Sequence, residues 1–199
     1  MTSLDLWPIG NCQVSALIDR SGTIVWACVP RVDGDPLFSS LLGGEEPERG
    51  FWAIDLDECE TAEQEYLRNR PILVTRKTHS SGNAIEIVDF CPRFRRLGRA
   101  YRPVALVRTV RPLGGSPRVR VRLRPTQEWG EKTAPLPGGA NHIRFGLTPV
   151  PMRPTTDAPV GLVTEERLFR LERPLTFFLG PDESFESNLQ RTVEEMLAN

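Results

Sequence analysis

Residues 13–42, QVSALIDRSGTIVWACVPRVDGDPLFSSLL, contain the pattern that decides the fold. Apolar and polar residues alternate on either side of Ser21-Gly22, a pair that can supply the positive φ of a tight connection, so we predict a β-hairpin. A stiff corner follows, residues 30–36, with a proline at each end. It contains one base and two acids: Arg31, Asp33 and Asp35.

The same pattern recurs along the chain. The segment 50–56 predicts a third strand, and two more hairpins are predicted over 71–92 and 102–125, the second with its turn at residues 113–116. Further strands are predicted at 141–147, 160–165, 166–172 and 174–180. Roughly nine to twelve strands separated by turns indicate an all-β sandwich or barrel over residues 1–180. Two stretches rich in Pro and Gly, 126–141 and 148–159, are expected to be surface loops.

The period changes in the last segment, residues 181–199. Phe185, Leu189, Val193 and Met196 recur at helical spacing, and acids lie in the first turn. A helix of about a dozen residues is marginal alone, so this apolar stripe must pack on the β domain or on something absent. We favour the second alternative, in which residues 181–199 begin a linker helix and the chain is cut between two domains.

Composition limits the functions that are expected. Twenty-five Lys and Arg against 26 Asp and Glu leave a net charge of -1, which does not favour nucleic acid or an anionic membrane as a partner. No leader peptide or membrane span is apparent, so we expect a cytoplasmic protein. The four cysteines are widely spaced and there are two histidines, so we expect reduced, mostly buried thiols, no metal and no cofactor.

Two groups of charged residues were considered for chemistry. Side chains alternate along a strand, so arginines 118, 120, 122 and 124 share one face; we expect pairing with acids of neighbouring strands in preference to nucleic-acid binding. Asp33 with Asp35 is the acid pair that lies in an irregular, rigid segment, and a salt-bridged loop with Arg31 is favoured over the carboxyl pair of a glycosidase. Glu86 and Asp89 are expected on opposite faces of a strand.

Several motifs occur in an order that resembles one family. They are Ile-Gly-Asn-Cys at 9–12, Asp-x-x-Gly at 19–22, Trp-x-Cys at 26–28, Pro-Arg-x-Asp at 30–33 and Asp-Phe-x-Pro at 89–92. The ordered set resembles the N-terminal domain of glycoside hydrolase family 15, the glucoamylase and trehalase type. Val25, Val32 and Gly34-Asp35 depart from the commoner pattern, which leaves the preferred sugar open.

The resemblance implies a large antiparallel β-sandwich of two sheets, followed by a linker helix and an α/α barrel. In that family the barrel holds two glutamates that hydrolyse α-glucosidic bonds of oligosaccharides or trehalose with inversion, so no catalytic residue is assigned to this chain. It further implies that this domain supports the barrel and shapes its cleft, with Asn11, Trp26, Arg31, Asp33 and Asp35 as candidates for the interface or cleft rim. The alternative is an independent carbohydrate- or anion-binding module, in which tryptophans such as Trp7, Trp52 and Trp129 stack on sugars.

Overall fold

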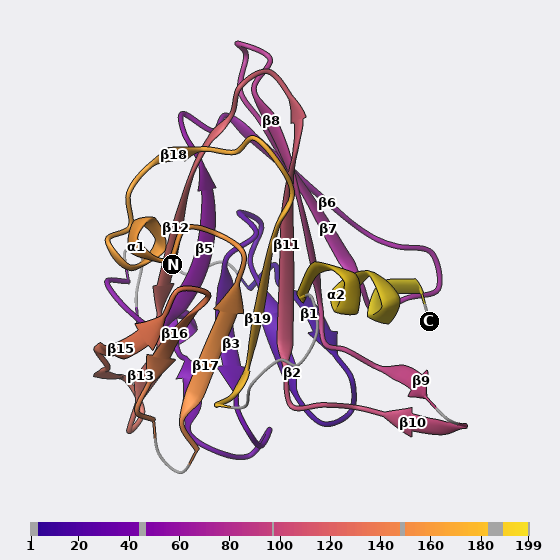
Figure 1. The fold of residues 1–199 in the computed structure, drawn as a ribbon, viewed down its shortest axis with the longest axis vertical. Helices are drawn as coiled ribbons and strands as arrows, with labels where there is room; N and C mark the ends of the chain where they lie inside the picture. Colours follow the sequence, from indigo (N-terminus) through magenta and orange to yellow (C-terminus); the bar gives the residue numbers. More distant parts are fainter. Residues whose placement is uncertain (1–3, 44–46, 97, 148–149, 183–188, 199) are drawn as a thin grey trace.

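A computed structural model describes residues 4–43, 47–96, 98–147, 150–182 and 189–198. Two large antiparallel sheets face each other, with β11, β17 and β19 in front of β3 and β5 in Figure 1. Sheet A has seven strands in the order β1-β2-β3-β5-β12-β18, with β4 beside β3. Their bounds are β1 (Trp7–Gly10), β2 (Ser15–Ile18), β3 (Ile24–Cys28), β4 (Pro36–Phe38), β5 (Phe51–Leu56), β12 (Arg118–Arg124) and β18 (Phe169–Arg170).

Sheet B has eight strands in the order β15-β16-β17-β19-β11-β8-β7-β6. Their bounds are β6 (Thr61–Tyr66), β7 (Leu73–Thr78), β8 (Ala84–Phe90), β11 (Leu106–Gly114), β15 (Pro135–Gly139), β16 (His142–Phe145), β17 (Met152–Thr156) and β19 (Leu175–Pro181). Two small pairs lie outside the sheets, β9 (Phe94–Arg96) with β10 (Arg99–Tyr101) and β13 (Thr126–Gln127) with β14 (Glu131–Lys132). The helices are η1 (Ser40–Leu42), α1 (Val160–Thr164) and α2 (Leu189–Ala198). The all-β sandwich with a C-terminal helix is confirmed.

The first two predicted hairpins are confirmed. β2 pairs with β3 and β7 pairs with β8, and their turns contain Gly22 at φ 76° and Gly82 at φ 87°. At Gly22 a Cβ atom would lie 3.0 Å from the Thr75 side chain of the other sheet, so this turn requires glycine both for its φ and for the close approach.

The third predicted hairpin, over 102–125, is wrong. β11 pairs with β8 and β19 in sheet B, whereas β12 pairs with β5 and β18 in sheet A, so the chain changes sheets at the glycine turn. Alternation along a strand shows which side chains share a face, but it does not say which strand lies beside it. β11 is buried on both faces, because Arg108 faces sheet A and Val107 faces α2.

Three other expectations need correction. Residues 160–164 form the helix α1 and not a strand, because the chain turns after Pro159 and packs Val163 against the core. The expected loop at 126–141 contains β13, β14 and β15, and the expected loop at 148–159 contains β17, of which Met152 is 1% exposed. Propensity misses these strands because they are short or rich in Pro and Gly, and pairing with another strand, such as β17 with β19, overrides the local preference.

The core between the sheets contains a buried ion pair. Arg108 in β11 and Asp89 in β8 lie opposite each other in register, and both are 0% exposed. Arg108 donates to both carboxylate oxygens of Asp89, at 2.7 and 3.1 Å, and to the backbone carbonyls of Trp52 and Gly22, each at 2.5 Å. Glu86 lies on the opposite face of β8 and binds Arg76 and Arg111, as expected from the alternation.

A second cation also links the two sheets. Nζ of Lys77 in β7 donates to the carbonyl of Ile54 in β5 at 2.7 Å, and burial lowers the pKa of this lysine. β3 and β5 share one register pair, Ile24 with Trp52, so their backbones separate beyond it. Arg108 binds the carbonyl at the last register pair, and Lys77 binds a carbonyl of β5 beyond it, where β3 is no longer paired.

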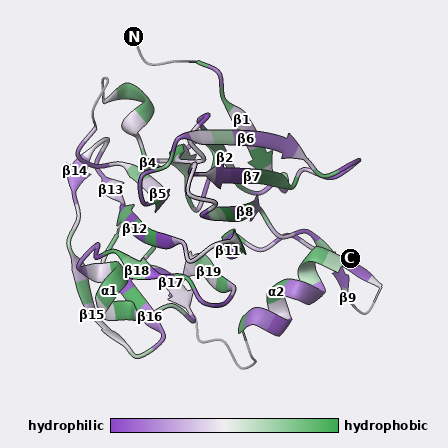
Figure 2. Ribbon diagram, turned by 90° about the horizontal axis from the view of Figure 1, so that it is seen from above, coloured by the Kyte–Doolittle hydropathy of each residue, from purple (hydrophilic) through white to green (hydrophobic). Residues whose placement is uncertain are grey.

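The C-terminal helix packs on this domain, so the favoured expectation that it needs an absent surface is wrong. Val193 is 1% exposed and forms a cluster with Ile72, Phe90 and Val107, against which Leu189 and Met196 pack. α2 lies on the face of sheet B turned away from β5 and β12 (Figure 2). Phe185, the first member of the predicted stripe, lies outside the described residues. Among the described residues, no helix has the length and apolarity needed to cross a membrane.

Candidate functional site

One end of the sandwich carries the features that the sequence singled out. β3 ends there and leads into the corner, and β8 ends there and leads into the pair β9–β10. The two ends are linked through Asn11, which follows β1 and binds the carbonyl of Pro92 just after β8. β12 also ends there and leads into β13. This "corner end" is the lower end in Figure 1, opposite the turns that contain Gly82 and Gly115.

In the corner, Arg31 and Asp33 form the predicted salt-bridged loop. Two nitrogens of Arg31 donate to the two carboxylate oxygens of Asp33 at 2.9 and 2.8 Å, and both side chains are mostly exposed. The hydrogen bond from Arg31 holds the pKa of the Asp33 carboxyl below its usual value. This carboxyl is therefore ionised at neutral pH and cannot act as a general acid there.

Asp35 faces a different partner. Its carboxylate accepts hydrogen bonds from the backbone N–H groups of Glu128 and Trp129, the latter at 2.7 Å. Asp33 and Asp35 thus bind separate groups, and they do not form the paired acid and base that glycoside hydrolysis requires.

The turn that Asp35 holds is strained. Glu128 and Trp129 have φ of 48° and 60°, and Gly130 follows at 125°. Left-handed backbone in two consecutive residues other than glycine costs about 1–2 kcal/mol for each. The strained turn holds Trp129 at the surface, where this residue is 69% exposed. Of the three tryptophans considered for sugar stacking, Trp52 is excluded at 0% exposure, Trp7 is half-buried against Tyr66, and Trp129 is presented to solvent.

Asn11 lies beneath the second feature of this end. It is 2% exposed, and its Nδ2 donates to the carbonyls of Pro92 and Pro103 at 2.8 and 2.9 Å. Its Oδ1 accepts from the N–H groups of Gln13 and Val14. Pro92 precedes β9 and Pro103 follows β10, so these two prolines are the points, here called the feet, at which the pair joins the rest of the domain. Asn11 fixes both feet and does not itself form part of the surface.

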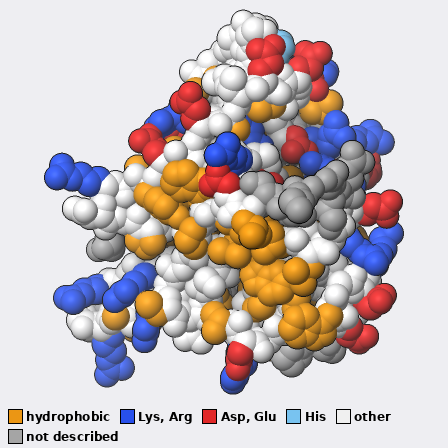
Figure 3. Space-filling view, turned by 180° about the vertical axis from the view of Figure 1, so that it is seen from behind, with side chains coloured by type: hydrophobic (Ala, Val, Ile, Leu, Met, Phe, Trp, Pro, Cys, Tyr) orange, Lys and Arg blue, Asp and Glu red, His pale blue; other side chains and the backbone are white. Residues whose placement is uncertain are grey.

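The pair β9–β10, with its flanking residues 93–102, forms an arginine arm. Five arginines occur in these ten residues without any acid, a signal that the sequence analysis overlooked. Phe94 stacks on Tyr101, with 5.6 Å between ring centres, and this contact stiffens the arm. The arm projects from the molecule in Figure 1 and, seen from behind, carries basic side chains clear of acidic ones in Figure 3. Among the described side chains, no ion pair includes an arginine of the arm: Arg93, Arg95, Arg99 or Arg102.

Trp26 contributes apolar surface. It lies opposite Leu17 in the β2–β3 register, and both side chains are half-buried. Figure 3 shows that hydrophobic side chains gather on this rear side of the molecule, where sheet A lies. Trp26 is thus less buried than a core residue such as Trp52.

Three of the four arginines in the β12 stripe are paired with acids, as expected, whereas no ion pair of Arg120 is found among the described residues. Arg118 binds Asp57 at 2.5 Å, Arg122 binds Asp55 at 2.6 Å and Arg124 binds Glu166 at 2.5 Å. Arg122 and Arg124 also lie over the ring of Phe51, at 4.9 and 5.4 Å from its centre. These three arginines are already paired with acids within the fold. Little of the stripe is therefore available to bind the phosphate groups of a nucleic acid.

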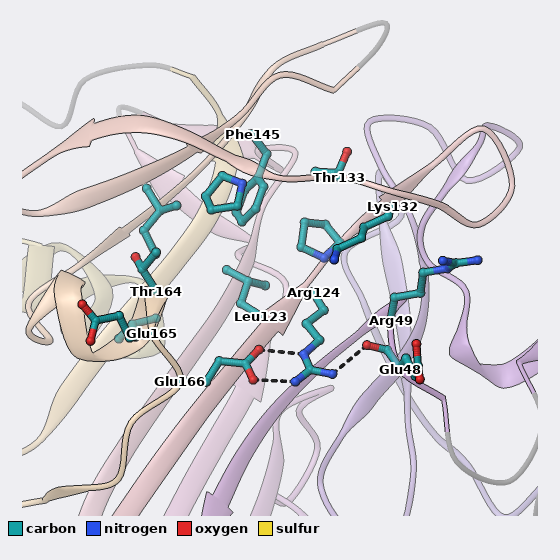
Figure 4. A pocket seen from close by; sticks show the side chains of 14 residues that line it. Glu48, Arg49, Leu123, Arg124, Lys132, Thr133, Phe145, Thr164, Glu165 and Glu166 are labelled. Atoms are coloured by element: carbon teal, nitrogen blue, oxygen red, sulfur yellow. Dashed lines mark hydrogen bonds and ion pairs between the residues drawn. The ribbon is translucent and has the colours of Figure 1, made fainter.

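Two hollows adjoin this end. The larger, about 520 Å³, lies between the end of β12, α1 and β16; Figure 4 shows Arg124 reaching between Glu166 and the carbonyl of Glu48, with Leu123 and Phe145 nearby. The smaller, about 250 Å³, is lined by Trp129, Leu42 and the hydroxyl residues Ser39 and Ser40. Arg49 lines both hollows.

The four cysteines are free thiols, as expected, but only two of them are buried. Cys28 and Cys91 lie inside the fold, whereas Cys12 and Cys59 are exposed. Burial raises the pKa of Cys91 to about 12. Within the described parts of the chain, no group of three or more His, Cys, Asp or Glu side chains could hold a metal ion.

Comparison with known families gives one match. The model of the trehalase-like N-terminal domain matches residues 6–159, which is most of the chain and spans the corner, the arm and the turn of Trp129. No curated protein and no solved structure gives a significant match. With the two-sheet sandwich and the ordered motifs, this match shows that the chain belongs to the family of trehalase-like N-terminal domains, from glycoside hydrolases of the trehalase and glucoamylase type.

Proposed function

We propose that this domain supports a catalytic α/α barrel and shapes the rim of its cleft, and that the corner end of the sandwich is the surface that meets the barrel. The observation that carries the proposal is the arginine arm. A buried asparagine with four hydrogen bonds holds the two ends of an exposed arm, and the arm's described arginines have no acidic partner among the residues that the structure describes. Arginine forks pair well with carboxylates, so an acidic surface of the barrel fits this arm.

The proposed reaction belongs to the barrel. Two glutamates there would act as acid and base in an inverting attack of water on an α-glucosidic bond of an oligosaccharide or of trehalose. Arg31, Asp33 and Trp26 would contact the barrel or line the rim of its cleft, while Asn11 and Asp35 would hold the arm and the Trp129 turn in position.

The first test is activity. The 199-residue chain alone should release no glucose from maltose, maltooligosaccharides or trehalose, because the acids of the corner do not converge. Turnover that Asp33→Asn abolishes would make the corner catalytic and would contradict the proposal. The coding sequence after Asn199 is the second test: a reading frame that continues into a helical barrel supports the proposal, and a stop codon there contradicts it.

The third test addresses the surface within the longer protein. Reversing two charges of the arm, with Arg93→Glu and Arg95→Glu, should weaken domain association and lower kcat/KM. Arg120→Glu with Arg170→Glu is the matched control, because both arginines are exposed on sheet A away from the arm and, like those of the arm, form no ion pair among the described residues. Equal effects of the two double variants on activity and on association would show that the arm is not the interface.

A further inference from the structure

We propose that the hollow beside Trp129 and the larger hollow that shares Arg49 with it form a binding groove for a neutral oligosaccharide, a linear glucan, on this domain itself. The proposal concerns binding by the chain and needs no barrel. Its starting point is the position of Trp129, whose indole lines the smaller hollow although most of its surface is exposed. The flat face of an indole suits the C–H face of a pyranose ring.

The position of this indole is imposed by the fold. Asp35 binds the backbone of Glu128 and Trp129, and the N–H of Gly130 donates to the carbonyl of Gln127 at 3.1 Å. Thr126, at the base of the turn, is 1% exposed, and its hydroxyl lies 3.1 Å from that of Ser39. Because the turn is held from both sides, the ring needs little further ordering to receive a ligand, which favours binding.

The size of the hollows suits a chain of several sugar units. The larger has a volume of about 520 Å³, within the range of small-molecule sites. The smaller adds about 250 Å³, and Arg49 lines both, so one ligand can extend from Trp129 past Arg49 towards Phe145. The apolar residues Leu123 and Phe145 lie at the far end, as Figure 4 shows.

The charge of the lining indicates a neutral ligand. Among the described residues, three basic side chains line the two hollows, Arg49, Arg124 and Lys132, against four acidic ones, Glu48, Glu131, Glu165 and Glu166. Arg124 is already held by Glu166 through two hydrogen bonds of 2.7 and 2.5 Å. A phosphorylated or sulfated ligand would find no net positive field here, whereas the hydroxyl groups of a sugar can both donate to carboxylates and accept from guanidinium groups.

Asp35 is a positioning residue in this site. It contacts the backbone of the turn and lies outside the lining of both hollows. Asp35→Asn would replace one of its two acceptor oxygens by an amide donor, so the left-handed turn would lose one of the two bonds that hold it. Affinity should then fall although every lining side chain is unchanged.

The test is titration of the 199-residue chain with maltoheptaose, followed by calorimetry and by tryptophan fluorescence. We expect saturable binding with a Kd on the order of 1 mM, insensitive to salt because the ligand is neutral. Trp129→Ala should lower affinity at least about tenfold, and Trp129→Phe should retain part of it. Asp35→Asn should weaken binding in calorimetry while circular dichroism stays unchanged.

Tyr101→Ala is the matched control, because this tyrosine is also partly exposed but lies on the arm. It should leave affinity unchanged. Absence of saturable binding, binding that Trp129→Ala does not alter, or binding of a sulfated glucan in place of the neutral one would each overturn the proposal. Failure here would leave the docking proposal intact, since that proposal rests on the arm and is tested by domain association.

Discussion

The ion pair between Arg108 and Asp89 allows a quantitative prediction about what holds the two sheets together. Asp89→Asn preserves the shape of the side chain but leaves a guanidinium without its counter-ion at a fully buried position. Removing one partner of a buried ion pair costs about 3–5 kcal/mol of unfolding free energy. For a domain of this size, about 2–4 °C of Tm corresponds to each kcal/mol, so Tm should fall by roughly 6–20 °C.

A double variant separates the ion pair from the cross-sheet bonds. Arg108→Met with Asp89→Leu removes both charges, a change that is often neutral for an isolated buried pair. Here it also removes the donors to the carbonyls of Trp52 and Gly22. A buried acceptor left unsatisfied costs about 1–3 kcal/mol, so the double variant should remain destabilised by roughly 2–6 kcal/mol.

The assay is urea unfolding followed by tryptophan fluorescence, with the midpoint and slope fitted for each variant. Asp55→Asn serves as the control, because Asp55 pairs with Arg122 at a half-exposed site where the expected loss is about 0–1 kcal/mol. The reasoning is refuted if the double variant regains the stability of the unmodified protein, or if Asp89→Asn costs no more than the control.

Three further predictions concern the thiols, the arm and the C-terminal helix. An aromatic disulfide reagent at pH 8 should label two thiols rapidly and the other two after unfolding, because burial raises the pKa of both buried thiols; four rapid reactions would contradict the burial of Cys28 and Cys91. Asn11→Ala should lower the free energy of unfolding by about 1–3 kcal/mol and speed hydrogen exchange at the feet of the arm, because the carbonyls of Pro92 and Pro103 lose their donor. Unchanged exchange there would show that the arm does not depend on Asn11. Val193→Asp should detach α2 and lower the helical signal in circular dichroism while the sheets persist. Gln190→Asp, on the exposed side of the helix, should not have this effect. Equal effects of the two variants would refute the packing of α2 on sheet B.

Local patterns in the sequence were sufficient to predict strand pairing where the partner strand is the next one along the chain. The turns at Gly22 and Gly82 join strands that pair with each other, so alternation and turn residues predicted both hairpins correctly. The same reasoning failed at Gly115, because strands on the two sides of that turn belong to different sheets. The alternation of β12 correctly predicted its arginine face, since the two faces of a strand are a local property.

The sequence by itself determined the all-β class, the two hairpins, the shared face of the β12 arginines and the salt bridge within the corner, because each depends on residues close together in the chain. The tertiary structure alone decided what crosses between distant segments. It placed Arg108 against Trp52 and Gly22, Asn11 beneath the arm, Asp35 under the Trp129 turn and α2 on sheet B. Spacing along the chain carries no information about such contacts, since they form only when both sheets close and bury groups that must then find partners.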